Sequence, residues 1–307
     1  MSPADSTAST ASIGLRNTTL AGIGMMLIGI FGYSLNDALG KWLVATYSVP
    51  QVMCIRGAFA AAVLLPFLWR DRHSLRAISA HPGQHALRML FVILDVGCFY
   101  LAVAHLPLAT VMTYYLAGPI YVTALSPFLL GEQVGWRRWS AVAVGFMGVL
   151  IALKPASGGI GLPELAAFVG SLSFGLLMIV TRKLRGASET LLITTQVVAP
   201  LVAGLCIAPF MWVAPSPVDF GLIGFLGIVS MVAGVCVNRA LKLAPASTVV
   251  PYQYTFIIWA TVFGYLFFGD RPEPNVLVGA AIIIGAGLFI FMREHRASRT
   301  GREMPPA

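Results

Sequence analysis

Charged residues are scarce in this 307-residue chain, since Asp, Glu, Lys and Arg make up 10% of it while hydrophobic residues make up 58%. A soluble domain carries roughly 25% charged residues. With so few polar groups, the chain could not cover the surfaces of soluble domains. The scarcity therefore excludes a soluble protein and predicts one whose solvent is the lipid bilayer.

Cysteine is also scarce, and its four copies, Cys54, Cys98, Cys206 and Cys236, lie inside apolar runs rather than in loops. Neither a CxxC nor an HExxH motif is present, and disulfide frameworks and zinc sites need such spacings. A nucleophile elbow and a phosphate-binding loop are missing too. We therefore expect no metal, no cofactor and no enzyme activity. The net charge of +8 does not indicate nucleic acid, because the basic residues lie between apolar runs.

What the sequence does contain is apolar runs close to the roughly 20 residues that cross a bilayer as a helix. Short connections marked by Pro or Gly separate several of them. We expect an all-α integral membrane protein with ten transmembrane helices, at residues 19–44, 49–69, 85–104, 108–129, 137–154, 161–182, 188–211, 219–241, 246–268 and 275–293. We expect residues 1–18 to be a disordered cytoplasmic tail and residues 294–307 to be a basic cytoplasmic tail.

An internal repeat relates the two halves of the chain. The stretch LPLATVMTYYLAGPIYVTALSPFLLGE, from Leu106 to Glu132, returns without a gap 138 residues later as APASTVVPYQYTFIIWATVFGYLFFGD, from Ala244 to Asp270. Repetition of this kind indicates a duplicated unit. We expect a first five-helix repeat at 19–154 and a second at 161–293. Because five is odd, the second repeat enters the membrane from the opposite side, as in many secondary transporters.

The Lys and Arg residues of the loops set the orientation. With the N-terminus in the cytoplasm, sixteen of them fall on the cytoplasmic side, Arg88 included, whereas Lys154 and Arg271 fall outside. We therefore expect both termini to be cytoplasmic.

Four charged side chains lie inside predicted helices of the first repeat, namely Asp37, Lys41, Arg56 and Asp95. Charged groups in a bilayer are costly and mark binding sites or ion pairs. Asp37 and Lys41 are spaced to pair at i and i+4. With two positive and two negative charges, the four side chains form a nearly neutral cluster. Tyr33 and Asn36 share the Asp37 face of their helix. We expect a substrate or coupling-ion site here; the alternatives are a structural salt-bridge network and, for Lys41, snorkelling towards the interface.

Aromatic residues recur at equivalent places in the repeat, with Tyr114 and Tyr121 on the fourth helix and Tyr252 and Trp259 on the ninth. Pro119 and Pro251 each remove a backbone donor and favour a break in these helices. Irregular backbone at membrane depth is tolerated where protein or water covers it. We expect two broken helices that line a cavity with aromatic walls, with ordinary packing or lipid-facing aromatics as the alternative.

The stretch LPLATVMTYYLAGPIYVTALSPFLLGEQVGWRRWSAVAVGFMGVLIAL and the inverted repeat resemble the drug/metabolite transporter superfamily, specifically its EamA-like family, over nearly all of residues 19–293. Two further stretches, FGYSLNDALGKWLVATYSV at 31–49 and VPYQYTFIIWATVFGYLFFGDRP at 250–272, resemble bacterial RibN-type riboflavin transporters. They resemble S-adenosylmethionine uptake carriers less closely. The resemblance implies a multi-pass secondary transporter of the bacterial inner membrane that works by alternating access.

The resemblance places riboflavin uptake first among the functions. A flat, neutral molecule with polar edges suits aromatic walls and a balanced charge cluster, with Asn36 and Gln253 to hydrogen-bond its edges. A balanced cluster also suits zwitterions, so S-adenosylmethionine and exported amino acids or other metabolites are alternatives. A membrane-embedded enzyme or receptor is a different class, opposed by the missing catalytic motifs and extramembrane domain. A homodimer, the direction of transport and the coupling ion stay open. The candidate substrate-binding residues are Tyr33, Asn36, Asp37, Lys41, Arg56, Asp95, Tyr114, Tyr121, Tyr252, Gln253 and Trp259.

Overall fold

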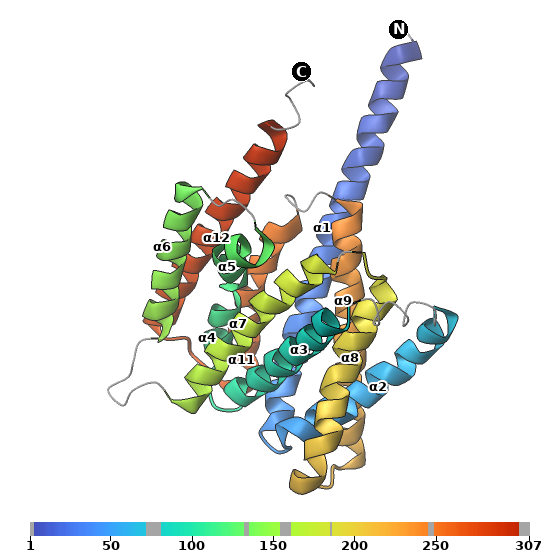
Figure 1. Ribbon diagram of the computed structural model, residues 1–307, viewed down its shortest axis with the longest axis vertical. Coiled ribbons are helices and arrows are strands. Elements are labelled where there is room, and N and C mark those ends of the chain that lie inside the picture. Colours follow the sequence, from blue (N-terminus) through green and yellow to red (C-terminus); the bar gives the residue numbers. More distant parts are fainter. Residues whose placement is uncertain are drawn as a thin grey trace.

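The computed structural model describes residues 3–71, 81–131, 135–153, 161–184, 186–244 and 249–300. Its regular secondary structure over these ranges is helical (Figure 1). In chain order the elements are α1 Pro3–Val44, α2 Val49–Arg70, α3 Pro82–Val103, α4 Leu108–Tyr115, α5 Gly118–Leu130, α6 Trp136–Leu153, α7 Leu162–Lys183, α8 Glu189–Ile207, η2 Ala208–Met211, α9 Pro217–Leu243, η3 Val250–Thr255, α11 Phe256–Phe268 and α12 Pro274–Thr300. All ten predicted segments are present, with residues 154 and 246–248 of them outside the described residues, and the fourth, seventh and ninth are each made of two elements.

Most of these helices are long and apolar enough to cross a bilayer. Eight segments of the described chain meet that criterion: α1 from Thr18, α2, α3, α4 with α5, α7, α8 with η2, α9 and α12. The helix α6 adds a shorter apolar stretch, Trp139–Ala152. The predicted fold class, an all-α membrane protein, is confirmed.

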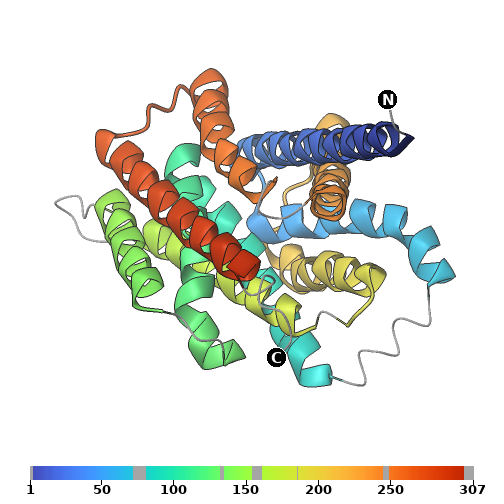
Figure 2. The same cartoon turned by 90° about the horizontal axis from the view of Figure 1, so that it is seen from above.

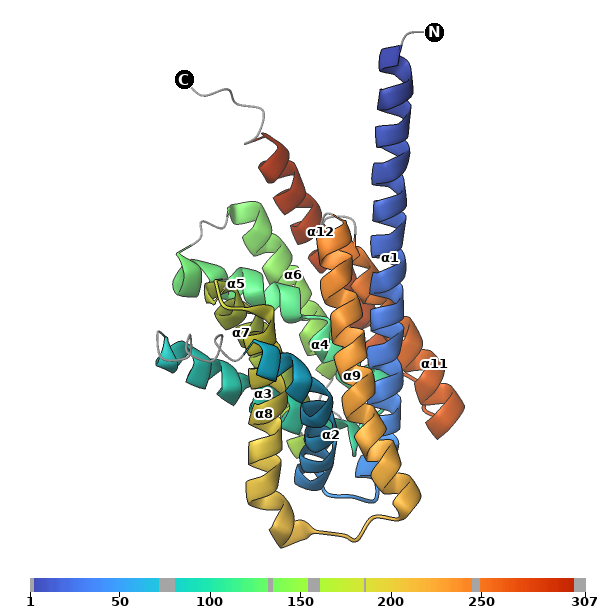
Figure 3. The ribbon, with the colours of Figure 1, turned by 90° about the vertical axis from the view of Figure 1, so that its right-hand side faces the viewer.

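The structure differs from the sequence expectation at the N-terminus. The helix α1 begins at Pro3 and projects beyond the other helices (Figure 3), whereas a disordered tail is expected through residue 18. Proline fits the first turn of a helix, where its missing N–H has no intrahelical partner, and the alanines that follow favour helix. At the other terminus, α12 likewise continues to Thr300, into the predicted basic tail.

The helices of the two halves interleave. The helix α1 packs along α9, α3 along α7, α2 along α8, and α6 along α12. In the repeat, α1 corresponds to α7 and α3 corresponds to α9, so exchanging the halves converts the α1–α9 pair into the α7–α3 pair. The α2–α8 and α6–α12 pairs are each converted into themselves. This is the pattern of an inverted repeat. Seen from above, α12 lies beside α6 and α1 beside α9 (Figure 2). The start of α1 and the end of α12 lie at the same end of the bundle (Figure 1).

The two broken helices follow the sequence repeat residue for residue. The helix α11, Phe256–Phe268, begins and ends 138 residues after α5, Gly118–Leu130. Each ends at a glycine in the left-handed conformation, Gly131 with φ 69° and Gly269 with φ 67°. Glycine adopts this conformation readily because it has no Cβ. The duplication is therefore visible in the backbone geometry as well as in the sequence.

The breaks expected near the prolines are present. A turn at residues 116–117 separates α4 from α5, and Pro119 occupies the first turn of α5. In the second half the 3-10 helix η3, with Pro251 in its first turn, takes the place of the end of α4. The backbone before the break is thus α-helical in one half and 3-10 in the other.

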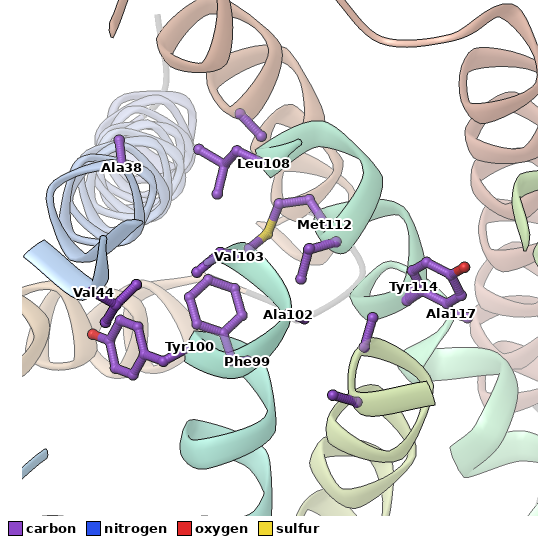
Figure 4. Packing of buried hydrophobic residues seen from close by; sticks show 14 of the residues in the cluster. Ala38, Val44, Phe99, Tyr100, Ala102, Val103, Leu108, Met112, Tyr114 and Ala117 are labelled. Atoms are coloured by element: carbon purple, nitrogen blue, oxygen red, sulfur yellow. The ribbon is translucent and has the colours of Figure 1, made fainter. Parts of the chain in front are cut away.

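The main hydrophobic cluster joins α1, α3 and α4 with helices of the second half (Figure 4). Tyr100 of α3 is fully buried there. Its ring lies against Gly40 of α1, where a side chain would overlap the tyrosine. The close approach of α1 and α3 brings the polar residues of the two helices towards each other.

Candidate functional site

Arg56 joins α2 to α3 and α9 inside the bundle. Its Nη1 donates to the hydroxyl of Tyr100 at 2.5 Å, and its Nη2 donates to Oγ of Ser230 at 3.1 Å. The guanidinium also lies 5.5 Å from the centroid of the Tyr100 ring, within range of a cation–π interaction. These partners are neutral, so the positive charge of Arg56 has no direct counter-ion among the described residues.

Two carboxylates, on Asp37 of α1 and Asp95 of α3, lie near this charge. Both interact electrostatically with Arg56, and they interact with each other. No basic side chain that the structure describes lies within ion-pair distance of either. Asp37 accepts a hydrogen bond from Nδ2 of Asn36 at 3.0 Å, and the hydroxyl of Tyr115 donates to the main-chain carbonyl of Asp95 at 3.0 Å. The structure thus brings together three of the four predicted charged residues.

Tyr33 and Asn36 lie on the same face of α1 as Asp37. The hydroxyl of Tyr33 points towards α9, where a Cβ added to Gly234 would lie 2.9 Å from it. Asn36 is 3% exposed, and its Oδ1 has no hydrogen-bond partner among the described residues. A buried acceptor without a donor is costly, by about 1–3 kcal/mol. This oxygen is therefore available to a bound molecule.

Lys41 does not belong to this cluster. Its Nζ forms an ion pair with Asp270 and donates to the carbonyl of Leu106 at 3.1 Å. It also lies 4.6 Å from the centroid of the Phe268 ring. The expected pairing with Asp37 and the balanced cluster of four are therefore wrong. The i and i+4 spacing permits that pair, but Gly269 turns the chain after α11 so that Asp270 reaches the lysine.

The ion pair is one of several contacts at the end of the bundle opposite the termini. Asp270 also accepts from the backbone N–H of Leu108 at 3.4 Å. At the same end, the hydroxyl of Tyr47 donates to Asp219 at 2.6 Å. This hydrogen bond raises the pKa of Tyr47, because it stabilises the protonated hydroxyl. The contacts hold α1 to α9 and to the segment that follows α11, at the end predicted to face outwards.

The repeated aromatic residues have a packing role. Tyr121 packs edge to face on Phe168 of α7, with ring centroids 6.2 Å apart, and Trp259 packs in the same way on Phe31 of α1 at 4.9 Å. Each pair joins a broken helix to the first helix of the other half, so the two pairs are equivalent in the repeat. The structure therefore supports the packing alternative for these two positions rather than a shared aromatic wall.

The other predicted residues of the broken helices are more scattered. Tyr114 is 1% exposed and points away from the group of Phe99 and Tyr100 (Figure 4), and its hydroxyl has no partner among the described residues. Tyr252 packs against the buried cluster beside α1, and Gln253 is half-buried on the same 3-10 helix. Neither has a recorded hydrogen bond to Asp37 or Asp95 within the part of the chain that the structure describes.

Sequence analysis missed Tyr115, which lies beside Asp95 and packs edge to face on Phe99 with centroids 5.5 Å apart. A signal for it was present, because Tyr115 aligns with the candidate Gln253 at the 138-residue offset. The sequence also places Arg88 with the loop residues, whereas the structure buries it inside α3.

A groove of about 480 Å³ lies between α6 and α12, lined by apolar side chains with Arg137 and Ser140. It contains none of the predicted site residues. Its size alone does not place a substrate there, because the charged groups lie among α1, α2, α3 and α9.

The comparison with known protein families divides the chain into the same two halves. The sequence profile of the EamA-like transporter family matches residues 20–154 and again residues 161–292. An S-adenosylmethionine uptake transporter of Rickettsia felis is 30% identical over 286 residues, which cover 91% of this chain and 95% of that protein. A riboflavin transporter of Rhizobium johnstonii is 31% identical over 281 residues, which cover 90% and 92% respectively.

A solved crystal structure has a similar fold, with a TM-score of 0.57 and 18% identity, covering 92% of this chain and 99% of that one. At this identity the likeness concerns the fold alone. The double match to the family profile agrees with the helical architecture and with the apolar membrane spans. This chain is a multi-pass membrane protein that belongs to the EamA-like transporter family, a family of transporters and not of enzymes.

Proposed function

We propose that this chain carries a small metabolite across the bacterial inner membrane by alternating access, and that its substrate is a zwitterion of net positive charge, of the S-adenosylmethionine class. The observation that carries this is the charge of the central cluster. Once Lys41 is paired with Asp270, two carboxylates, Asp37 and Asp95, lie near a single guanidinium, that of Arg56. A cluster with an excess negative charge inside a bilayer is costly unless a cation joins it.

S-adenosylmethionine has the complementary set of charges. Its sulfonium and ammonium groups are positive and its carboxylate is negative, so each charge can meet an opposite one among Asp37, Asp95 and Arg56. Its adenine amino group can donate to the free Oδ1 of Asn36. The aromatic rings of Tyr33 and Tyr115, which lie next to the carboxylates, offer faces for the adenine to stack on. The relative from Rickettsia felis is named for this substrate.

Riboflavin is the second candidate, favoured by the tyrosines around the cluster and by the name of the relative from Rhizobium johnstonii. Sequence analysis ranks it first because of the resemblance to RibN-type transporters, with a charge cluster expected to be balanced as the physical support. The Lys41–Asp270 pair removes that argument, since a neutral substrate leaves the excess negative charge without a partner. The order of the two candidates is therefore reversed.

Uptake into proteoliposomes of purified protein tests the proposal. We expect saturable uptake of radiolabelled S-adenosylmethionine. S-adenosylhomocysteine, which lacks the sulfonium charge, should compete roughly tenfold less well, since losing one charged contact is worth about 1.4 kcal/mol or more. Saturable riboflavin uptake without S-adenosylmethionine uptake would establish the second candidate. Equal competition by the sulfonium and its neutral counterpart would remove the charge argument.

A further inference from the structure

A second arginine inside the bundle lies between α3, α7 and α8. Arg88 is 3% exposed. Its Nε donates to Oγ1 of Thr181 at 3.1 Å, and its Nη1 donates to the carbonyl of Leu192 at 3.0 Å and to Oγ1 of Thr195 at 2.5 Å. All three acceptors are neutral, and Nη2 has no acceptor among the described residues. No carboxylate that the structure describes lies within ion-pair distance of this buried cation.

The surroundings of Arg88 contain a further unsatisfied group. His85, one turn earlier on α3, is 1% exposed, and its Nδ1 has no hydrogen-bond partner among the described residues. At 3.6 residues per turn, His85, Arg88 and Asp95 lie on one face of α3, with Arg88 about 10 Å from Asp95 along the axis. The face that carries a carboxylate of the central cluster therefore carries a cation two turns away.

Arg88, which is buried, and Arg56, which is half-buried, occupy related places in the inverted repeat. Arg56 reaches from α2 to Ser230 of α9, and Arg88 reaches from α3 to Thr195 of α8. Exchanging the halves converts the α2–α9 contact into the α8–α3 contact. Each arginine lies within two turns of the start of its helix, and α2 and α3 start at opposite ends of the bundle. One guanidinium inside the bundle therefore lies towards each membrane face.

We propose that Arg88 is a second binding group for the carboxylate of the substrate, used when the site opens towards the cytoplasm, as Arg56 is used when it opens outwards. The inference rests on the proposed function. In the conformation described, the hydroxyls of Thr181 and Thr195 occupy the donors of Arg88. A carboxylate makes stronger hydrogen bonds to a guanidinium than a hydroxyl does, so it displaces them once α7 and α8 move away from α3.

The kinetics of uptake from each face test this directly. Right-side-out and inside-out membrane vesicles expose opposite faces, and S-adenosylmethionine and its decarboxylated analogue differ in the carboxylate. We expect Arg88→Gln to raise the KM for S-adenosylmethionine at least about tenfold in inside-out vesicles, or about 1.4 kcal/mol, and much less in right-side-out vesicles. Arg56→Gln should show the reverse. Neither variant should raise the KM for the decarboxylated analogue.

Two controls separate binding from packing. Thr181→Val removes a partner of Arg88 that the carboxylate displaces, and it should leave both KM values within about twofold, because Thr181 itself does not bind the substrate. Arg88→Lys keeps the charge but loses the forked geometry, so it replaces Arg88→Gln if that variant is not inserted. A rise in KM that is equal for both probes, or equal at both faces, would show that Arg88 only joins the helices. Absence of S-adenosylmethionine uptake by the unmodified protein would overturn the proposed function and this inference together.

Discussion

The two halves of this transporter repeat each other in backbone and packing but differ in the charges they place inside the bundle. The helices α5 and α11 share their bounds at the 138-residue offset, their glycine caps and their edge-to-face aromatic contacts. By contrast, Arg56 of the first half aligns with Thr194 of the second, whose hydroxyl bonds to its own helix at the carbonyl of Thr190. The difference supports the proposal that the shared framework serves the movement of the halves, whereas the groups that select the substrate lie in the first half.

Removing a carboxylate from the first half should have the largest effect on transport. We expect Asp37→Asn and Asp95→Asn to insert normally and to lower S-adenosylmethionine uptake by roughly 10- to 100-fold, because a hydrogen bond to a charged group contributes about 1.5–3 kcal/mol. The matched control is Thr194→Val, at the equivalent of Arg56 in the second half, which should keep uptake within about twofold. Equal losses in all three variants would show that the halves share the site.

Breaking the ion pair between the halves should affect stability next most strongly. Lys41→Met and Asp270→Asn each leave a partly buried charge without its partner. The double variant should therefore be more stable than the sum of the single effects predicts, with a coupling of about 1–3 kcal/mol. Thermal unfolding of the four proteins in detergent measures this coupling. Strictly additive shifts in Tm would mean that the pair does not hold the two halves together.

The two glycine caps should respond alike. Gly131→Ala and Gly269→Ala each force a side chain into the left-handed region, which costs about 1–2 kcal/mol. The control is Gly285→Ala within α12, where an added Cβ meets no atom, and where alanine should stabilise the helix by up to about 1 kcal/mol. Unfolding midpoints compare the three variants. A clear difference between the two cap variants would show that the backbone symmetry does not extend to the energetics.

The smallest effects should come from the aromatic pairs. Phe31→Leu and Phe168→Leu each remove one edge-to-face contact, worth about 0.5–1.5 kcal/mol beyond area burial. Both should lower Tm slightly and leave the KM for S-adenosylmethionine unchanged. A tenfold rise in KM for Trp259→Leu, with an unchanged Tm, would instead restore the aromatic cavity expected from the sequence.

The parts of the structure that sequence reasoning predicted depend on local or repeated signals. Helix positions follow from the length of apolar runs, and the breaks follow from Pro119 and Pro251, which disturb the backbone where they occur. Asp37, Arg56 and Asp95 are recognisable because a charge inside an apolar run is costly in a bilayer and indicates an ion pair or a binding site. The sidedness of the termini stays a prediction from loop charges.

The errors concern residues whose partners are distant in the chain. Lys41 has a carboxylate one turn away, yet it pairs with Asp270 because the α11 cap brings that residue to the end of α1. Arg88 resembles the loop arginines around it, and only the packing of α7 and α8 against α3 makes it a buried group. Tyr114 and Tyr115 are neighbours in sequence, so the direction that each faces depends on where α4 packs.

The interleaving of the halves also sets an order of events during synthesis. The helix α1 ends at Val44, but α9, the helix it packs along, does not begin until Pro217. At ~5–20 residues per second, a ribosome needs on the order of 10–30 s to make the intervening chain. Throughout that interval Tyr33 lies in the bilayer without α9, the helix that its hydroxyl faces in the complete protein. The newborn first half is therefore the stage at which quality-control proteases have the longest opportunity to remove this transporter.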